Sequence, residues 1–171
     1  MRKYLVIGNP IEHSLSPLLH NFWIKKHNLN AFYEKQLLEK KDIEKILSDM
    51  RVSKIHGINV TVPFKNMVIP FLDQLSDTAQ ETQSVNIIFK RQNKLVGDNT
   101  DVYGFSEAVK LTNFDPANKS ALILGAGGVV PSVLLALKNM GVDQITLSNR
   151  TKEKAINPVS YTHLRAHETR R

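Results

Sequence analysis

The sequence predicts an α/β fold in two lobes. Short apolar runs of strand length alternate with segments whose apolar residues recur at helical spacing. Near residue 121 an apolar run leads into a glycine cluster and then into a helical segment, as a strand, a tight turn and a helix would. The turn-rich stretch 113–119 (NFDPANK) separates the lobes, and it sets the expected domains at 1–112 and 113–156.

In the first lobe, strands are expected to alternate with helices. The run YLVIG at 4–8 is short and apolar and ends in glycine, as buried parallel strands do. Ser16 is the expected N-cap of a helix, with Pro17 in its first turn. Gln92 and Asn93 separate two strand-like runs and indicate a hairpin. We expect strands at 4–8, 31–37, 55–62, 85–91 and 94–96, and helices from 16 onward and at 42–50, 65–72, 77–83 and 101–111.

The second lobe is expected to be incomplete. It has room for strands at 121–124 and 144–147 around a helix at 129–140, whereas a full domain has about 100–150 residues. A polar helix begins at 151–156. The last stretch, 157–171 (NPVSYTHLRAHETRR), resumes no apolar period. We expect it to be a cloning-derived or frame-shifted tail outside the fold, with a natural exposed terminus as the alternative.

Composition excludes several classes of protein. The 171 residues are 42% hydrophobic and 23% charged, which is typical of a globular protein. No apolar run is long enough for a membrane helix or a signal peptide. Because the chain has no cysteine, it can form no disulfide, thiolate metal site or cysteine nucleophile, and no metal site is expected. We expect a cytoplasmic protein.

The net charge of +7 raises the question of nucleic-acid binding. The lysines are scattered over amphipathic segments and form no basic stripe interleaved with aromatic residues. Attraction of an anionic small ligand is therefore the better interpretation, and no nucleic-acid partner is expected.

The glycine-rich turn predicts a dinucleotide site in a partial Rossmann-type domain. Gly125, Ala126, Gly127 and Gly128 follow a strand and precede a helix, where a backbone can approach a pyrophosphate. Gly125 and Gly127 match the first two glycines of the fingerprint, while the third position is Val130.

The end of the next strand discriminates between cofactors. An acidic residue there binds the ribose hydroxyls of NAD, but this sequence has Asn149, Arg150 and Thr151. No carboxylate repels a phosphate, and Arg150 can pair with one. The sequence therefore predicts NADP, with a merely solvent-exposed arginine as the alternative.

Polar groups also gather at strand ends in the first lobe, where open α/β sheets bind ligands. Ser14 and Ser16 flank a helix start and can bind a carboxylate, although Ser16 can equally be a simple N-cap. Thr61 and Asn59 share one face of a strand, and Asn86 interrupts an apolar run in which it needs partners.

Lys65 and Asp101 are the candidates for proton transfer. A lysine beside a carboxylate in a partly desolvated cleft can pass a proton to or from an alcohol. Near a nicotinamide cofactor this chemistry is alcohol–ketone redox. Taken singly, Lys65 is equally a solvated side chain and Asp101 a helix-capping acid.

Several of these segments resemble the shikimate dehydrogenase family over about residues 4–156. The matching motifs are GNPIEHSLSPLLHN at 8–21, NVTVPFK at 59–65, GDNTDVYG at 97–104, GAGG at 125–128 and NRT at 149–151. Two departures are Ile87, where the family usually has Thr, and Pro131, where it has a small or basic residue.

The resemblance implies reversible reduction of 3-dehydroshikimate to shikimate with NADPH, a step towards chorismate and the aromatic amino acids. It implies Lys65 as the acid/base, paired with Asp101. It implies that Ser14 and Ser16 hold the substrate carboxylate, and that Thr61, Asn86 and Asp101 hold ring hydroxyls, with Lys65 in contact. The implied NADP-binding residues are Asp77, Gly125, Ala126, Gly127, Gly128, Val129, Asn149, Arg150, Thr151 and Lys154.

Two rival functions stay open. One is a quinate/shikimate dehydrogenase that uses NAD, against which Arg150 argues. The other is a truncated, non-catalytic fragment that binds only a shikimate-like ligand. The expected partner in every case is a small molecule, with no membrane partner, and the expected assembly is a monomer or a homodimer.

Overall fold

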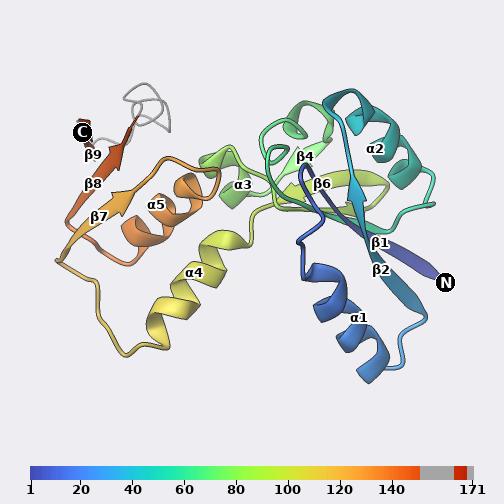
Figure 1. The fold of residues 1–171 in the computed structure, drawn as a ribbon, viewed down its shortest axis with the longest axis horizontal. Helices are drawn as coiled ribbons and strands as arrows, with labels where there is room; N and C mark the ends of the chain where they lie inside the picture. Colours follow the sequence, from blue (N-terminus) through green and yellow to red (C-terminus); the bar gives the residue numbers. More distant parts are fainter. Residues whose placement is uncertain (151–163, 169–171) are drawn as a thin grey trace. The chain divides into compact units, whose positions relative to one another are not determined.

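The computed structural model describes residues 1–150 and 164–168, and the chain divides into two compact units, Met1–Asn99 and Thr100–Arg171 (Figure 1). This division lies before the boundary of 112/113 that the turn-rich stretch suggests. The reason is that helix α4 (Asp101–Lys110) packs on helix α5 (Val130–Asn139) through Val102, Phe105, Leu135 and Ala136. None of the helices among the described residues has the length and apolar character needed to cross a bilayer.

The first unit is built on a six-stranded mixed sheet with the order β2-β1-β3-β5-β6-β4. Strand β1 pairs in parallel with β2 and β3, and β5 is antiparallel to both β3 and β6. The elements of this unit are β1 (Arg2–Gly8), α1 (Ser16–Lys26), β2 (Ala31–Leu37), η1 (Lys40–Asp42), α2 (Ile43–Arg51), β3 (Gly57–Val60), η2 (Ile69–Phe71), β4 (Gln74–Leu75), α3 (Asp77–Thr82), β5 (Ile87–Arg91) and β6 (Lys94–Asp98).

Alternation along β1 distributes its side chains between two apolar clusters. Leu5 and Ile7 belong to the main core, together with the buried stripe of α2. Tyr4 and Val6 belong to a smaller cluster with Ile24 of α1. Because successive strand residues point to opposite faces, α1 and α2 lie on opposite sides of this part of the sheet, as Figure 1 shows.

Helix α2 confirms the predicted amphipathic stripe. Its apolar residues recur at helical spacing, and all four are buried in the main core. They are Ile43, Ile46, Leu47 and Met50. The opposite face of α2 carries charged residues, so burial of the stripe positions this helix on the sheet.

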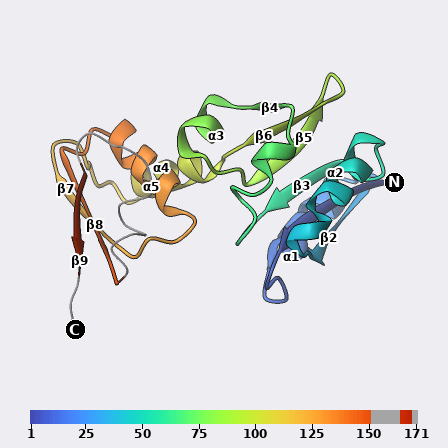
Figure 2. The same cartoon turned by 90° about the horizontal axis from the view of Figure 1, so that it is seen from above.

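The β5–β6 hairpin is also as predicted, with a two-residue turn at Gln92 and Asn93 (Figure 2). Both residues have positive φ, 49° and 63°, as a type I′ turn requires. Asparagine tolerates this region better than most residues, so the turn suits the sequence at its second position. Strand β5 begins at Ile87 rather than at residue 85, so Asn86 lies just before it, and β6 continues to Asp98 rather than ending at residue 96.

Helix α1 differs from α2 because it contains no buried residue. Several of its large apolar side chains face solvent, among them Leu18, Leu19 and Phe22, which are 74%, 56% and 58% exposed. The helix contacts the sheet mainly through the partly buried Ile24 and the polar residues described below.

The prediction of a helix at 65–72 is wrong. Residues 62–68 form successive turns, and only Ile69–Phe71 forms a short 3₁₀ helix. Pro70 has no N–H to donate to the carbonyl four residues earlier, so the α-helical ladder cannot continue there. The two-residue strand β4, for which the sequence contains no local signal, follows directly.

The second unit contains α4 and a three-stranded parallel sheet with the order β7-β8-β9. Its strands are β7 (Ser120–Leu124), β8 (Gln144–Asn149) and β9 (Leu164–Glu168). Strand β9 corrects the expectation that the last stretch lies outside the fold, because its backbone pairs with β8 from Leu164 to Glu168. The polar helix expected at 151–156 falls outside the described residues.

Candidate functional site

The loop between β1 and α1 presents two serine hydroxyls at the start of a helix. Ser14 Oγ accepts a hydrogen bond from the Ser16 N–H at 3.4 Å, and the Ser14 N–H donates to the Ile11 carbonyl at 3.1 Å. Ser16 is the first helical residue rather than the N-cap, which is Leu15. Pro17 is in the first turn as predicted, and that turn contains no acidic residue. A helix start with hydroxyls and no acid attracts an anion such as a carboxylate.

Thr61 follows the neighbouring strand β3 and packs against the end of β1. Its N–H donates to the Ile7 carbonyl at 2.9 Å, and the Val62 carbonyl accepts from the Asn9 N–H at 3.0 Å. A Cβ on Gly8 would lie 2.6 Å from the Thr61 Cγ2, so only glycine permits this approach. The serine loop and Thr61 are therefore at the carboxyl ends of adjacent parallel strands.

Lys65 and Asn86 are joined to the same end of the sheet by backbone hydrogen bonds. The Lys65 carbonyl accepts from the Val85 N–H at 2.8 Å, and the Asn86 carbonyl accepts from the Val60 N–H at 2.8 Å. Phe64, which is 2% exposed, anchors the turn that carries Lys65, and the Lys65 side chain itself is half-buried. The first unit thus brings Ser14, Ser16, Thr61, Lys65 and Asn86 onto adjoining segments.

Beside these segments, a polar network connects α1 with β2 and β3. The Asn21 side chain donates to the Tyr33 carbonyl at 2.8 Å and accepts from the Tyr33 N–H at 2.9 Å. The His20 and Tyr33 rings are stacked, with centroids 4.2 Å apart. The Tyr33 hydroxyl donates to Asn59 Oδ1 at 2.7 Å. Burial lowers the pKa of His20 and raises the pKa of Tyr33, so both side chains are neutral at pH 7.

A cavity of about 870 Å³ adjoins this network between α1 and the sheet. Its lining is largely apolar and aromatic and includes Tyr4, Trp23, Tyr33 and Ile87. Asn59 is one of the polar residues in the lining, and its side chain is already bonded to Tyr33.

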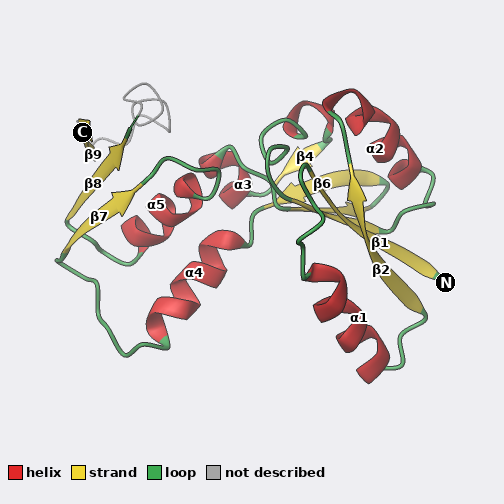
Figure 3. Cartoon of the chain, viewed as in Figure 1, coloured by secondary structure: helices red, strands yellow, loops and turns green. Residues whose placement is uncertain are grey.

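In the second unit, the glycine-rich turn follows β7 and precedes α5, as predicted (Figure 3). Gly125 has φ +99°, a conformation that L side chains rarely adopt, and its N–H donates to the Ser148 carbonyl at 2.7 Å. Apart from the adjoining residues, no atom of the described part of the chain lies within 4 Å of a Cβ placed on Gly125 or Gly127. The turn therefore leaves open space beside its backbone and before a helix N-terminus, which fits a pyrophosphate.

The other predicted cofactor residues are distributed over the chain. Asn149 ends β8, and the exposed Arg150 follows it. Thr151 and Lys154 lie outside the described residues. Asp77 is the exposed first residue of α3 in the first unit, and Asp101 is the first residue of α4 in the second.

Sequence reasoning missed Tyr33, Asn21 and the role of Asn59. Tyr33 lies in none of the motifs that the sequence analysis identified. Its partner Asn59 is 26 residues away in sequence and two strands away in the sheet, so no local pattern connects them. Asn21 and Asn59 lie in the motifs at 8–21 and 59–65, and Asn59 shares a strand face with Thr61, but these signals gave neither residue a role.

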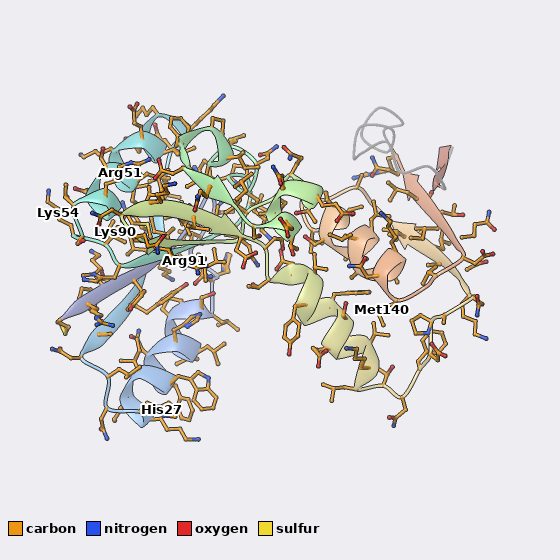
Figure 4. The ribbon with its side chains drawn as sticks, turned by 180° about the vertical axis from the view of Figure 1, so that it is seen from behind. His27, Arg51, Lys54, Lys90, Arg91 and Met140 are labelled. Carbon is orange, nitrogen blue, oxygen red and sulfur yellow. The ribbon has the colours of Figure 1, made fainter. Side chains whose placement is uncertain are left out.

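The basic residues outside this site mostly have local partners. Figure 4 labels Arg51, Lys54, Lys90 and Arg91 on the first unit. Arg51 pairs with Asp73 and Lys54 with Asp49, while Lys90 donates to the Ser53 hydroxyl and the Arg51 carbonyl. Within residues 1–150 and 164–168, no group of three or more histidine or acidic side chains is placed to hold a metal ion.

Comparison with known proteins gives consistent matches. Residues 6–88 match the model of the shikimate dehydrogenase substrate binding domain. The shikimate dehydrogenase (NADP(+)) of Pelagibacter ubique is 58% identical over 155 residues, which are 91% of this chain and 58% of that protein. The Aquifex aeolicus protein of the same name is 43% identical over 153 residues, with 90% and 56% covered. The chain thus spans less than two thirds of the length of these relatives.

Solved structures show the same likeness. The crystal structure of shikimate dehydrogenase from Aquifex aeolicus has a TM-score of 0.90 and 40% identity, with 98% of this chain and 62% of that chain covered. The enzyme from Thermus thermophilus, solved in complex with NADP(H) and shikimate, has a TM-score of 0.87 and 32% identity, with 98% and 63% covered. With the glycine-rich turn and the polar segments of the first unit, these matches show that the chain is similar to the shikimate dehydrogenases in sequence and in fold.

Proposed function

We propose that this chain carries the substrate-binding part of an enzyme that reversibly reduces 3-dehydroshikimate to shikimate with NADPH. The observation that carries the proposal is the joining of the serine loop, Thr61, Lys65 and Asn86 at one end of the first unit's sheet. The Thermus relative was solved with shikimate and NADP(H), which are the substrate and cofactor proposed here.

The substrate is held at two ends. Its carboxylate accepts hydrogen bonds from the Ser14 and Ser16 hydroxyls and benefits from the positive end of α1. Its ring hydroxyls bind the Thr61 hydroxyl and the Asn86 amide. These contacts fix which face and which carbon of the ring are presented for reaction, and they exclude water from that position.

Lys65 exchanges the proton. In the reducing direction its ammonium donates a proton to the carbonyl oxygen of 3-dehydroshikimate, which becomes a hydroxyl; in the reverse direction the amine accepts that proton. The reaction balances as one ketone, one NADPH and one proton converted to one alcohol and one NADP⁺.

The second unit fits the cofactor. Gly125, Ala126, Gly127, Gly128 and Val129 would hold the pyrophosphate in the open space beside the turn. Asn149 and Arg150, with Thr151 and Lys154, would meet the 2′-phosphate, and Asp77 would lie near the nicotinamide. When bound, NADPH supplies the hydride that the carbonyl carbon receives.

A hybrid enzyme tests the proposal. In it, residues 1–150 of this chain are continued by the C-terminal part of the Pelagibacter ubique relative. We expect the hybrid to oxidise shikimate with NADP⁺, followed by the absorbance of NADPH, and to oxidise quinate more slowly. The 171-residue chain alone, titrated with shikimate in a calorimeter, distinguishes the rival of a binding fragment. Shikimate binding by this chain alongside an inactive hybrid would favour that rival.

Arg150 should determine the preference for NADP over NAD. In the hybrid, Arg150→Ala should weaken NADP⁺ binding by about tenfold to a hundredfold, because a charge-assisted hydrogen bond to the phosphate contributes about 1.5–3 kcal/mol. NAD⁺ binding should not change, since NAD⁺ has no 2′-phosphate. Arg91→Ala, which removes the same charge from the exposed end of β5, is the matched control. Equal losses for both cofactors would contradict the assignment.

A further inference from the structure

The Tyr33 hydroxyl is a buried donor that acts on strand β3. The Tyr33 side chain is 5% exposed, and its hydroxyl donates to Asn59 Oδ1 at 2.7 Å. Burial raises the pKa of Tyr33 above its usual value, so the hydroxyl keeps its proton at neutral pH and can donate this hydrogen bond. Tyr33 therefore holds one end of the Asn59 amide.

The other end of the same amide reaches the candidate substrate site. Asn59 Nδ2 donates to the Asn86 carbonyl at 3.3 Å. A backbone carbonyl can only accept, so the NH₂ group must face Asn86 and the amide oxygen must face Tyr33. The two contacts together select one orientation of the Asn59 side chain.

Asn86 lies just before β5, and backbone hydrogen bonds join it to the neighbouring strands β3 and β6. Its carbonyl accepts from Asn59 and from the Val60 N–H, and its own N–H donates to the Asp98 carbonyl at 3.0 Å. These bonds hold the peptide groups on both sides of its Cα. They therefore set the direction in which the Asn86 side chain leaves the backbone.

Tyr33 is in turn fixed from α1, the helix that begins at Ser16. Asn21 brackets its backbone with two hydrogen bonds, and His20 stacks on its ring. One continuous series of contacts thus connects the helix of the serine loop with Asn86.

We propose that Tyr33 is a positioning residue that acts through Asn59 to hold Asn86 in place for a ring hydroxyl of the substrate. This inference rests on the proposed function, because it assumes that Asn86 binds such a hydroxyl. It assigns to Tyr33 a contribution to ligand recognition without any contact with the ligand.

A pair of ligands tests the inference on the 171-residue chain. Shikimate has ring hydroxyls, whereas cyclohex-1-ene-1-carboxylate has the carboxylate and no hydroxyl. In titrations followed by NMR, Tyr33→Phe should raise the Kd of shikimate about three- to tenfold, the size expected for one lost hydrogen bond. The Kd of the hydroxyl-free ligand should stay at its wild-type value. A merely structural effect would weaken both ligands alike.

Two further variants control the experiment. Tyr4→Phe removes a hydroxyl from another tyrosine of the same cavity, whose ring lies beside His56, and it should change neither Kd. Asn59→Thr removes the bridge, and adding Tyr33→Phe to it should raise the shikimate Kd no further, because the two residues act in series. If Tyr33→Phe does not fold, Asn59→Thr alone carries the same comparison of ligands.

The outcomes separate this inference from the function on which it rests. Selective loss of shikimate affinity in Tyr33→Phe supports it. An unchanged shikimate Kd, or equal losses for the two ligands, overturns it while the proposed substrate site stands. If the wild-type chain binds neither ligand, the substrate site itself is refuted, and the inference with it.

Discussion

Replacing Lys65 by alanine in the hybrid enzyme should lower kcat by about 10²–10⁴-fold, because a positioned acid/base contributes about that much to the rate. The KM for shikimate should change by only a few-fold, since the serine loop, Thr61 and Asn86 still hold the substrate. Steady-state kinetics, with NADP⁺ and shikimate in one direction and with NADPH and 3-dehydroshikimate in the other, measures kcat and KM separately.

The matched control for this experiment is Lys41→Ala. It removes the same charge from a lysine whose side chain is 76% exposed and pairs with Glu39. We expect its kcat and KM to equal those of the unsubstituted hybrid. An unchanged kcat in Lys65→Ala would remove the acid/base role, whereas a raised KM at constant kcat would leave Lys65 with substrate binding alone.

Leu47→Ala should lower the free energy of unfolding of the first unit by about 2.7–5 kcal/mol. Leu47 is 2% exposed and lies in the main core between α2 and the sheet. Truncation of this side chain removes buried apolar surface. It also leaves a cavity, because the surrounding close-packed side chains relax only partly. Urea unfolding of the 171-residue chain, followed by circular dichroism, gives the value.

Leu19→Ala makes the same substitution in the other large helix of the first unit. Leu19 is 56% exposed on α1, so its loss should change the free energy of unfolding by no more than about 0.5 kcal/mol. Similar losses in the two variants would mean that burial of the α2 stripe is not what stabilises this unit.

Elements with a strong local signal could be predicted from the sequence. The stripe of α2, the hairpin turn at Gln92 and Asn93, and the glycine-rich turn before α5 each follow from residues within a few positions of one another. The turn at 62–72 could not be predicted in the same way. Its apolar residues mimic a helix, whereas Pro70 interrupts the α-helical hydrogen bonds.

The division into two units and the arrangement of the candidate site could not be predicted from the sequence, because both depend on contacts between segments that are distant in the chain. Helix α4 joins the second unit because Val102 packs against α5, which no local pattern in residues 101–111 indicates. Motifs identified Lys65 and Asn86 individually, but the hydrogen bonds that join their segments depend on the order of strands in the sheet. The Tyr33–Asn59 contact bridges two strands that flank β1, so it becomes visible only once that order is known.

The position of the β5–β6 hairpin beside β3 has a consequence for the order in which the chain assembles during synthesis. Strands β1, β2 and β3 are complete by residue 60, and one edge of β3 then stays open until β5 has been made. At about 5–20 residues per second this takes one to a few seconds, whereas a hairpin closes in about 1–10 μs. The end of the sheet that carries Asn86 therefore cannot be completed before β5 has been made, because Asn86 and β5 supply the partners of β3 on that side.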